Sequence, residues 1–190
     1  MTVPRSAASF DALARPPRPT AVVLCEGNFG QIDGKTANGL VRHSERYEIL
    51  SVLDSHLAGR DAGQVLDGVA NGIPIDLDLD AALRRLGPAV PDCLIVGVAP
   101  TSGMLSPAER HVILDAMSRG LHEFLSDDVE FVAASAVNQV EILDIRRPRA
   151  KRDLRMFTGR INDVTCPRIA VLGTDGAIGK RTTATILTRT

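Results

Sequence analysis

Short apolar runs alternate with amphipathic stretches along most of this chain. The runs at 21–25, 47–53, 73–75 and 93–99 are of the length and composition of buried strands. Between them, the stretches at 37–43 and 79–86 and the one beginning at Pro107 carry apolar residues at helical spacing. The alternation predicts an α/β fold with a Rossmann-like, mostly parallel, three-layer sheet.

The middle of the chain has a clear helix start and a less certain continuation. Ser106 is placed to cap a helix that has Pro107 in its first turn and Glu109 three residues after the serine. The residues 121–125 and 129–134 read as a second helical stretch, and 140–145 as a further strand. On this interpretation no strand separates the two helices.

Composition narrows the class of protein. The chain has 190 residues, of which 44% are hydrophobic and 24% charged, and a formal net charge of −1, as in soluble globular proteins. Near-neutral charge gives no general attraction to nucleic acid or to anionic membranes. No apolar run is long enough to span a membrane and no signal peptide opens the chain, so we expect a cytoplasmic protein. The three cysteines lack the paired spacing of a disulfide framework or zinc knuckle, and we expect no metal site.

Four segments are predicted. We expect a flexible tail at 1–20, a Rossmann-like domain at 21–147, a basic linker at 148–167 and the start of another domain at 168–190. The run 146–155 is rich in Arg and Lys. It is either a solvated linker or a set of cations that folds over a phosphorylated ligand.

The C-terminal segment has the layout of a phosphate-binding loop. An apolar stretch at 168–172, typical of a buried strand, leads into a glycine-bearing turn, and a lysine and threonines open a helix. Backbone N–H groups and the helix dipole favour an anion there, and the lysine adds a cation. The alternative is an ordinary strand–turn–helix with a surface lysine. The predicted cofactor-binding residues are Gly173, Thr174, Asp175, Gly176, Gly179, Lys180, Arg181, Thr182 and Thr183.

Two positions depart from the usual P-loop pattern. Thr174 stands where the first glycine is expected, and Gly173 comes one residue earlier. Arg181 replaces the Ser or Thr that follows the lysine, and a guanidinium cannot ligate magnesium. Phosphate binding is therefore expected, whereas magnesium and ATP hydrolysis stay open. Because a P-loop domain needs further strands, the sequence resembles the front part of a longer protein.

A second glycine-rich turn follows the first predicted strand and ends in Gly34-Lys35-Thr36. It could be a loose dinucleotide fingerprint with Asp54 as the ribose-binding acid, another phosphate site, or a structural turn. The loop 99–103 follows the fourth strand and could line the same crevice. The predicted substrate-binding residues are Gly27, Asn28, Gly30, Lys35, Thr36, Asp54 and Arg60. His122 or Glu123 could serve as a general base.

Several blocks together resemble one bacterial and archaeal family, long catalogued as a domain of unknown function and now labelled D-glutamate N-acetyltransferase-like. The blocks begin at Glu26-Gly-Asn-Phe-Gly, Asp33-Gly-Lys-Thr, Ala58-Gly-Arg-Asp, Leu121-His-Glu-Phe and Gly173-Thr-Asp-Gly. The resemblance implies a Rossmann-like N-terminal domain joined to a P-loop NTPase-like domain, of which only the first strand and helix are present. It also implies a strand after Met117, which we expect to be deleted here.

The resemblance implies N-acetylation of a small amino acid, D-glutamate, from acetyl-CoA. Coenzyme A carries phosphates that the C-terminal loop could hold, and Arg42 or Arg60 could hold the substrate carboxylate. An ATP-dependent ligase or kinase is a second possibility, since the Gly-Thr-Asp loop resembles that of dethiobiotin synthetases. A nucleotide-binding module without turnover is the third. We expect a homo-oligomer when full length, and no appreciable catalysis from these 190 residues alone.

Overall fold

The computed structural model describes residues 18–98, 104–124, 129–143, 154, 156–167, 169–173 and 179–189. Contacts divide the chain into two compact units, Met1–Pro148 and Arg149–Thr190, and each is described by itself. The predicted tail at 1–20 lies almost wholly outside the described residues. The segment predicted as a linker falls within the second unit apart from its first residue.

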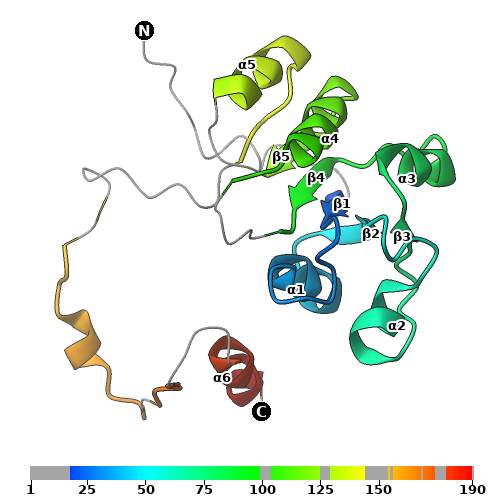
Figure 1. Cartoon of the computed structure of the whole chain (residues 1–190). Coiled ribbons are helices and arrows are strands. Elements are labelled where there is room, and N and C mark those ends of the chain that lie inside the picture. The colour runs from blue at the N-terminus through cyan, green and yellow to red at the C-terminus, as the bar shows by residue number, and fades with distance from the viewer. Residues whose placement is uncertain are drawn as a thin grey trace, which may run out of the picture. The chain divides into compact units, whose positions relative to one another are not determined.

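The first unit is built on five strands: β1 (Thr20–Leu24), β2 (Glu48–Leu53), β3 (Ile75–Asp76), β4 (Cys93–Val96) and β5 (His122–Phe124). Their order across the sheet is β3-β2-β1-β4-β5 (Figure 1), and every neighbouring pair is parallel. The chain therefore leaves β1 toward one edge of the sheet and crosses back to build the other edge from β4. This order confirms the predicted Rossmann-like sheet.

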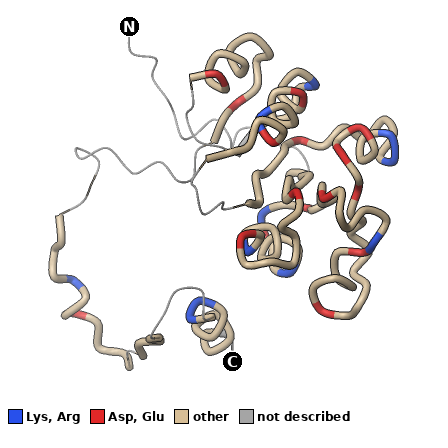
Figure 2. The backbone as a smooth tube through the Cα atoms, viewed as in Figure 1, with Lys and Arg blue, Asp and Glu red and all other residues tan. Residues whose placement is uncertain are grey.

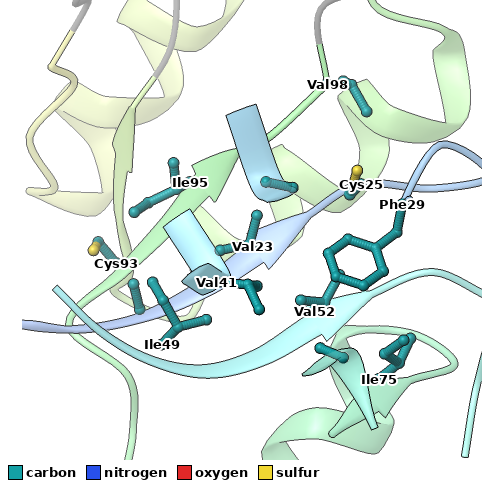
Figure 3. Packing of buried hydrophobic residues seen from close by; sticks show 13 residues of the cluster. Val23, Cys25, Phe29, Val41, Ile49, Val52, Ile75, Cys93, Ile95 and Val98 are labelled. Atoms are coloured by element: carbon teal, nitrogen blue, oxygen red, sulfur yellow. The ribbon is translucent and has the colours of Figure 1, made fainter. Parts of the chain in front are cut away.

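Five helices cover the two faces: α1 (Lys35–His43), α2 (Ala62–Asp67), α3 (Leu79–Leu86), α4 (Pro107–Ser118) and α5 (Val129–Asn138). The side chains of successive β1 residues point to opposite faces of the sheet. Val23 belongs with α1 and α2 to one buried cluster, shown in Figure 3, and Val22 with α3, α4 and α5 to the other. The sheet is thus the middle of three layers, as predicted.

Several sequence-based expectations are confirmed. The helix α3 spans the predicted 79–86, and β1, β2 and β4 begin within one residue of their predicted starts. The capping box of α4 forms: the Ser106 hydroxyl accepts the Glu109 N–H (3.2 Å), and the Glu109 carboxylate accepts the Ser106 N–H (2.7 Å). These elements have strong local signals, which their tertiary contacts reinforce.

The absence of a strand after Met117 is a wrong prediction, because β5 lies there and pairs with β4 through Cys93↔His122 and Ile95↔Phe124. The helix α4 ends at Ser118, Gly120 follows it with φ +84°, and the Leu121 N–H donates to the Ala116 carbonyl at 3.1 Å. This Schellman geometry stops the helix. The glycine was the signal available in the sequence, whereas pairing with β4 is a tertiary contact.

The residues 58–63 contain the start of α2. Asp61 caps this helix by accepting the Gln64 N–H at 2.9 Å, and it also accepts the N–H groups of Asn71 and Gly72. These backbone donors hold the pKa of the Asp61 carboxyl below its usual value. The segment is therefore an ordered corner.

The predicted strand at 140–145 does not form over its described part, 140–143, which makes a single bridge at Ile142. Residues 144 and 145 lie outside the described residues. Among the described residues, no helix combines the length and apolar character that crossing a membrane requires.

The second unit contains a short 3-10 helix, η3 (Arg160–Asp163), and the helix α6 (Lys180–Arg189). The strand predicted at 168–172 is not formed over its described residues, 169–172. Ile169 and Leu172 are 80% and 85% exposed. A strand needs a neighbour for its N–H and C=O groups, and no described segment pairs with this one. Ile186 and Leu187 of α6 are also exposed.

The contact between Gly97 and α1 generates a stability prediction. A Cβ at residue 97 would lie 2.7 Å from both the Ala37 Cβ and the Val23 Cγ1. We expect Gly97→Ala to lower the free energy of unfolding by about 1–3 kcal/mol in urea denaturation, because α1 would be forced off the sheet. Gly39→Ala is the control, since open space surrounds that helical glycine. It should stabilise by about 0.5–1 kcal/mol, and equal effects of the two variants would contradict the packing argument.

Candidate functional site

The carboxyl ends of β1, β2 and β4 lie side by side. They form the end of the sheet that we call its carboxyl edge. The glycine-rich turn 25–34 follows β1, Asp54 follows β2, and Gly97 follows β4. Ligands of open parallel sheets bind where the strand order reverses, which is between β1 and β4 here. The structure therefore brings Gly27, Asn28, Gly30 and Asp54 together, as the sequence predicted. The loop 99–103 lies outside the described residues.

Asp54 holds this turn in place. Its side chain is fully buried, and its two carboxylate oxygens accept the N–H groups of Phe29 (3.1 Å) and His56 (3.0 Å). A buried charge is stable only when it is paired or hydrogen-bonded. Both oxygens thus have protein partners, and Asp54 joins the turn after β1 to the turn after β2. A contact from Asp54 to a ribose stays a prediction.

Further side chains close the turn on itself. Glu26 accepts the Ser55 N–H at 2.9 Å and also the Ser55 hydroxyl. Asn38 of α1 accepts the Gly30 N–H at 3.0 Å and donates to the Gln31 carbonyl. Amides that would face a phosphate in a dinucleotide fingerprint are therefore engaged by the protein itself.

The sequence Gly34-Lys35-Thr36 matches the end of a P-loop motif, but its contacts in the structure differ from those of a phosphate-binding loop. A Cβ on Gly34 would lie 2.1 Å from the Asn28 carbonyl oxygen, so that glycine allows a close backbone approach. The N–H of Ala37, in the first turn of α1, donates to the Gly97 carbonyl at 3.2 Å. A protein carbonyl thus occupies the start of the helix, and of the three alternatives the geometry favours a structural turn. Lys35 is exposed and Thr36 half-buried.

The arginines proposed for the substrate carboxylate have different surroundings. Arg42 forms a salt bridge with Asp67, with 2.6 Å between Arg42 Nη2 and Asp67 Oδ1. Its guanidinium also donates to the Leu66 carbonyl. Arg60 has an exposed side chain, and its carbonyl accepts the Ile75 N–H at 2.9 Å. Arg60 therefore stays a candidate for binding an anionic group, while the structure assigns Arg42 to the contact between α1 and α2.

His122 begins the outer strand β5 and lies near the amino ends of the strands, whereas the glycine-rich turn lies at their carboxyl ends. His122 pairs with Cys93 at the amino end of β4, and its Nδ1 accepts the Glu141 N–H at 3.0 Å. The carboxyl end of β4, at Val96, is three residues or about 10 Å away along the strand. The backbone of Glu123 pairs with Leu94 in the middle of β4. His122 therefore lies apart from the cluster around Asp54, and the role of His122 or Glu123 as a general base stays a prediction.

The carboxyl edge of the sheet is electrostatically negative around Cys25. Burial, and to a smaller extent the carboxylates of Asp54, Glu109 and Glu26, together raise the pKa of the Cys25 thiol to about 12. Glu109 comes from the first turn of α4, so three elements contribute acids to this edge. The same carboxylates disfavour a bound phosphate there. In the described residues, no three His, Cys, Asp or Glu side chains are grouped to hold a metal ion.

The start of α6 carries the opposite charge. Gly179 has φ +86° directly before the helix, and the Thr183 N–H donates to the Gly179 carbonyl at 2.9 Å. Lys180 and Arg181 open the helix, coloured blue at its start in Figure 2. Their charges add to the positive end of the helix dipole, so an anion is favoured at this position.

The remaining predicted cofactor residues are distributed around this helix. Arg181, Thr182 and Thr183 are exposed, Lys180 is half-buried, and Gly173 is exposed. Thr174, Asp175 and Gly176 lie outside the described residues, as does most of the basic run 146–155. The described part of the predicted loop is therefore its helical end, from Gly179 to Thr183.

The bonds to Asp54 generate a second stability prediction. Asp54→Asn would place an amide NH₂ against one of the two N–H donors, and we expect the free energy of unfolding to fall by about 1–3 kcal/mol. Amide hydrogen exchange at Phe29 and His56 should accelerate in the same variant. Ser55→Ala, which removes an exposed hydroxyl contact, is the control and should cost about 0.5 kcal/mol. Unchanged exchange at both amides would contradict the role given to Asp54.

The surroundings of the cysteines predict an order of alkylation. Cys166 is exposed, whereas Cys25 and Cys93 are buried. At pH 8 a thiol with the raised pKa of Cys25 is about one part in ten thousand thiolate, and the thiolate is the reactive form. Mass spectrometry after iodoacetamide treatment of the native protein should find Cys166 modified first. Modification of Cys25 at a comparable rate would show that this edge of the sheet is open.

Two family models match successive parts of the chain. One, described as a domain of unknown function (DUF1611_N) and a Rossmann-like domain, matches residues 55–148. The other, described as a domain of unknown function (DUF1611_C) and a P-loop domain, matches residues 155–190. The P-loop match begins before residue 168, where the sequence analysis placed the start of this domain. No curated protein matches the chain.

A solved structure agrees with the family models. The crystal structure of a DUF1611 family protein from Anabaena variabilis is similar to this chain, with a TM-score of 0.75 and 26% sequence identity. The match covers 90% of this chain and 49% of that protein, so the chain spans about half the length of this relative. The shared fold and the two domain matches in the same order show that the chain belongs to the DUF1611 family, with a Rossmann-like N-terminal domain followed by a P-loop domain.

Proposed function

We propose that this protein binds a phosphate-bearing cofactor at the start of α6 and transfers an acyl group from it to a small amino acid. The observation that carries the binding step is the placement of Lys180 and Arg181 in the first turn of α6, directly after a glycine with positive φ. Backbone N–H groups, the helix dipole and two cations then act on the same anion. The match to a P-loop domain over residues 155–190 supports the same assignment.

The contrast between the two glycine-lysine turns supports α6 as the phosphate site. In the turn ending at Lys35, the Gly97 carbonyl accepts an N–H of the first helical turn, and acids gather around Cys25. In the turn ending at Lys180, the described first helical turn carries two cations and no acid. A phosphate dianion is therefore attracted to α6 and repelled by the carboxyl edge of the sheet.

Acetyl-CoA is the cofactor that the family resemblance suggests, and D-glutamate is the substrate. Coenzyme A carries a pyrophosphate and a 3′-phosphate, which Gly179, Lys180 and the first-turn N–H groups can hold. The substrate amine, once deprotonated, attacks the thioester carbonyl. A C–N bond forms, the C–S bond breaks, and the thiolate of coenzyme A leaves and takes up a proton. This chemistry needs no phosphate hydrolysis, so a loop that only binds phosphate is sufficient.

The Rossmann-like domain is the proposed source of substrate contacts. Glu26 and Glu109 give its carboxyl edge a negative field that attracts the ammonium group of an amino acid. The exposed Arg60 is the proposed partner of a substrate carboxylate, because Arg42 is held by Asp67. His122 and Glu123 remain the proposed bases.

Binding of acetyl-CoA and of ATP to the intact protein tests the cofactor site. Isothermal titration should show acetyl-CoA binding that Lys180→Ala weakens by at least about tenfold, the loss of one charge-assisted contact. Lys35→Ala is the matched control, since it removes the same side chain from the turn that ends in Gly34-Lys35-Thr36, and should leave the affinity for acetyl-CoA unchanged. Equal effects of the two substitutions, or none from either, would overturn the assignment.

Product analysis separates acyl transfer from the other functions. Incubation with acetyl-CoA and D-glutamate should yield the N-acetylated amino acid and free coenzyme A, detected by mass spectrometry. ATP consumption with magnesium and an acceptor would indicate a ligase or kinase instead, as the Gly-Thr-Asp sequence at Gly173 would allow. Tight nucleotide binding with no product from either mixture would indicate a binding module.

A further inference from the structure

We infer that the phosphate site at the start of α6 works without magnesium, with the Arg181 guanidinium in the place that a metal ion takes in other P-loop proteins. This inference rests on the proposed function and specifies the cofactor form that the site accepts. P-loop proteins hold magnesium through the Ser or Thr after the loop lysine and through an acid from a later strand. The residue that follows the loop lysine in this chain does not fit that donor set.

The residue after the lysine is the first disagreement. Arg181 follows Lys180 directly, and a guanidinium has five N–H donors and no acceptor, so it cannot ligate a cation. The Arg181 side chain is exposed at the start of the helix. It is therefore available to a ligand phosphate rather than packed into the protein.

The neighbouring threonines do not restore the missing hydroxyl. The α6 backbone is regular here, since the Thr183 N–H bonds to Gly179 and the Thr185 hydroxyl bonds to the Arg181 carbonyl, both at 2.9 Å. With about 100° per residue, Thr182 points about 200° around the helix from Lys180. Thr183 returns toward the face of Lys180, but about 4.5 Å farther along the axis. Neither hydroxyl occupies the position that directly follows the lysine.

The charge at the start of the helix is a second observation. The sequence of α6, Lys180–Arg189, contains no Asp or Glu. Among the described residues of the second unit, Asp163 of η3 carries the one carboxylate. Lys180 and Arg181, next to the positive end of the helix dipole, repel a divalent cation. The same guanidinium can bind two phosphate oxygens at once and neutralise the charge that magnesium neutralises elsewhere.

The experiment compares ATP binding to the intact protein in excess magnesium and in EDTA, by isothermal titration. The wild-type dissociation constants should agree within about threefold, a difference of about 0.6 kcal/mol. Arg181→Thr restores the usual residue and should bind ATP at least about tenfold more tightly with magnesium than without it. Arg181→Lys, which keeps the charge but not the fork of donors, should stay insensitive to magnesium.

Electron paramagnetic resonance of Mn²⁺ provides a readout that does not depend on affinity. With ATP and wild-type protein, no protein-bound Mn²⁺ signal should appear beyond that of Mn²⁺–ATP in solution, whereas Arg181→Thr should produce one. Wild-type binding that strengthens tenfold or more with magnesium would overturn the inference and leave the phosphate site intact. Failure of both ATP and acetyl-CoA to bind, with or without magnesium, would overturn the proposed function and the inference together.

Discussion

The arrangement of the Rossmann-like domain depends on a single buried carboxylate. Asp54 is fully enclosed, and two backbone N–H groups supply the hydrogen-bond donors that a buried carboxyl group needs. One donor comes from the turn after β1 and the other from the turn after β2. The carboxylate therefore fixes the relation between the two turns that end the central strands, and the glycines around it allow the backbone to close at that spacing.

This organisation has a consequence for ligand binding. When a turn satisfies its own amides, through Asp54, Asn38 and the Gly97 carbonyl, its affinity for an external phosphate falls. The acids around Cys25 act in the same direction. The start of α6 combines the helix dipole with two cations and no nearby acid in the described sequence of the helix. Charge thus distinguishes two turns that both contain a Gly-Lys pair at the start of a helix.

The sequence predicted the features with strong local causes. Helix α3 has the predicted bounds because its apolar residues recur at helical spacing, and α4 begins where a serine, a proline and a glutamate coincide. The strand β5 was missed because its three residues fit a helix as well as a strand, and only the ladder with β4 decides between them. The stretch at 169–172 shows the reverse: its composition suits a strand, but a strand does not form without a neighbour.

The same division holds for the candidate site. The amino-acid sequence by itself determined the α/β class, the glycines, the P-loop wording at Lys180 and the arginine that follows it, because spacing and residue type are local properties. Tertiary structure alone decided that Asp54 is buried and bonded on both oxygens, that Arg42 is held by Asp67, and that His122 lies at the far edge of the sheet. These depend on which strands become neighbours, and neighbours along a sheet are chosen by packing between residues far apart in the chain.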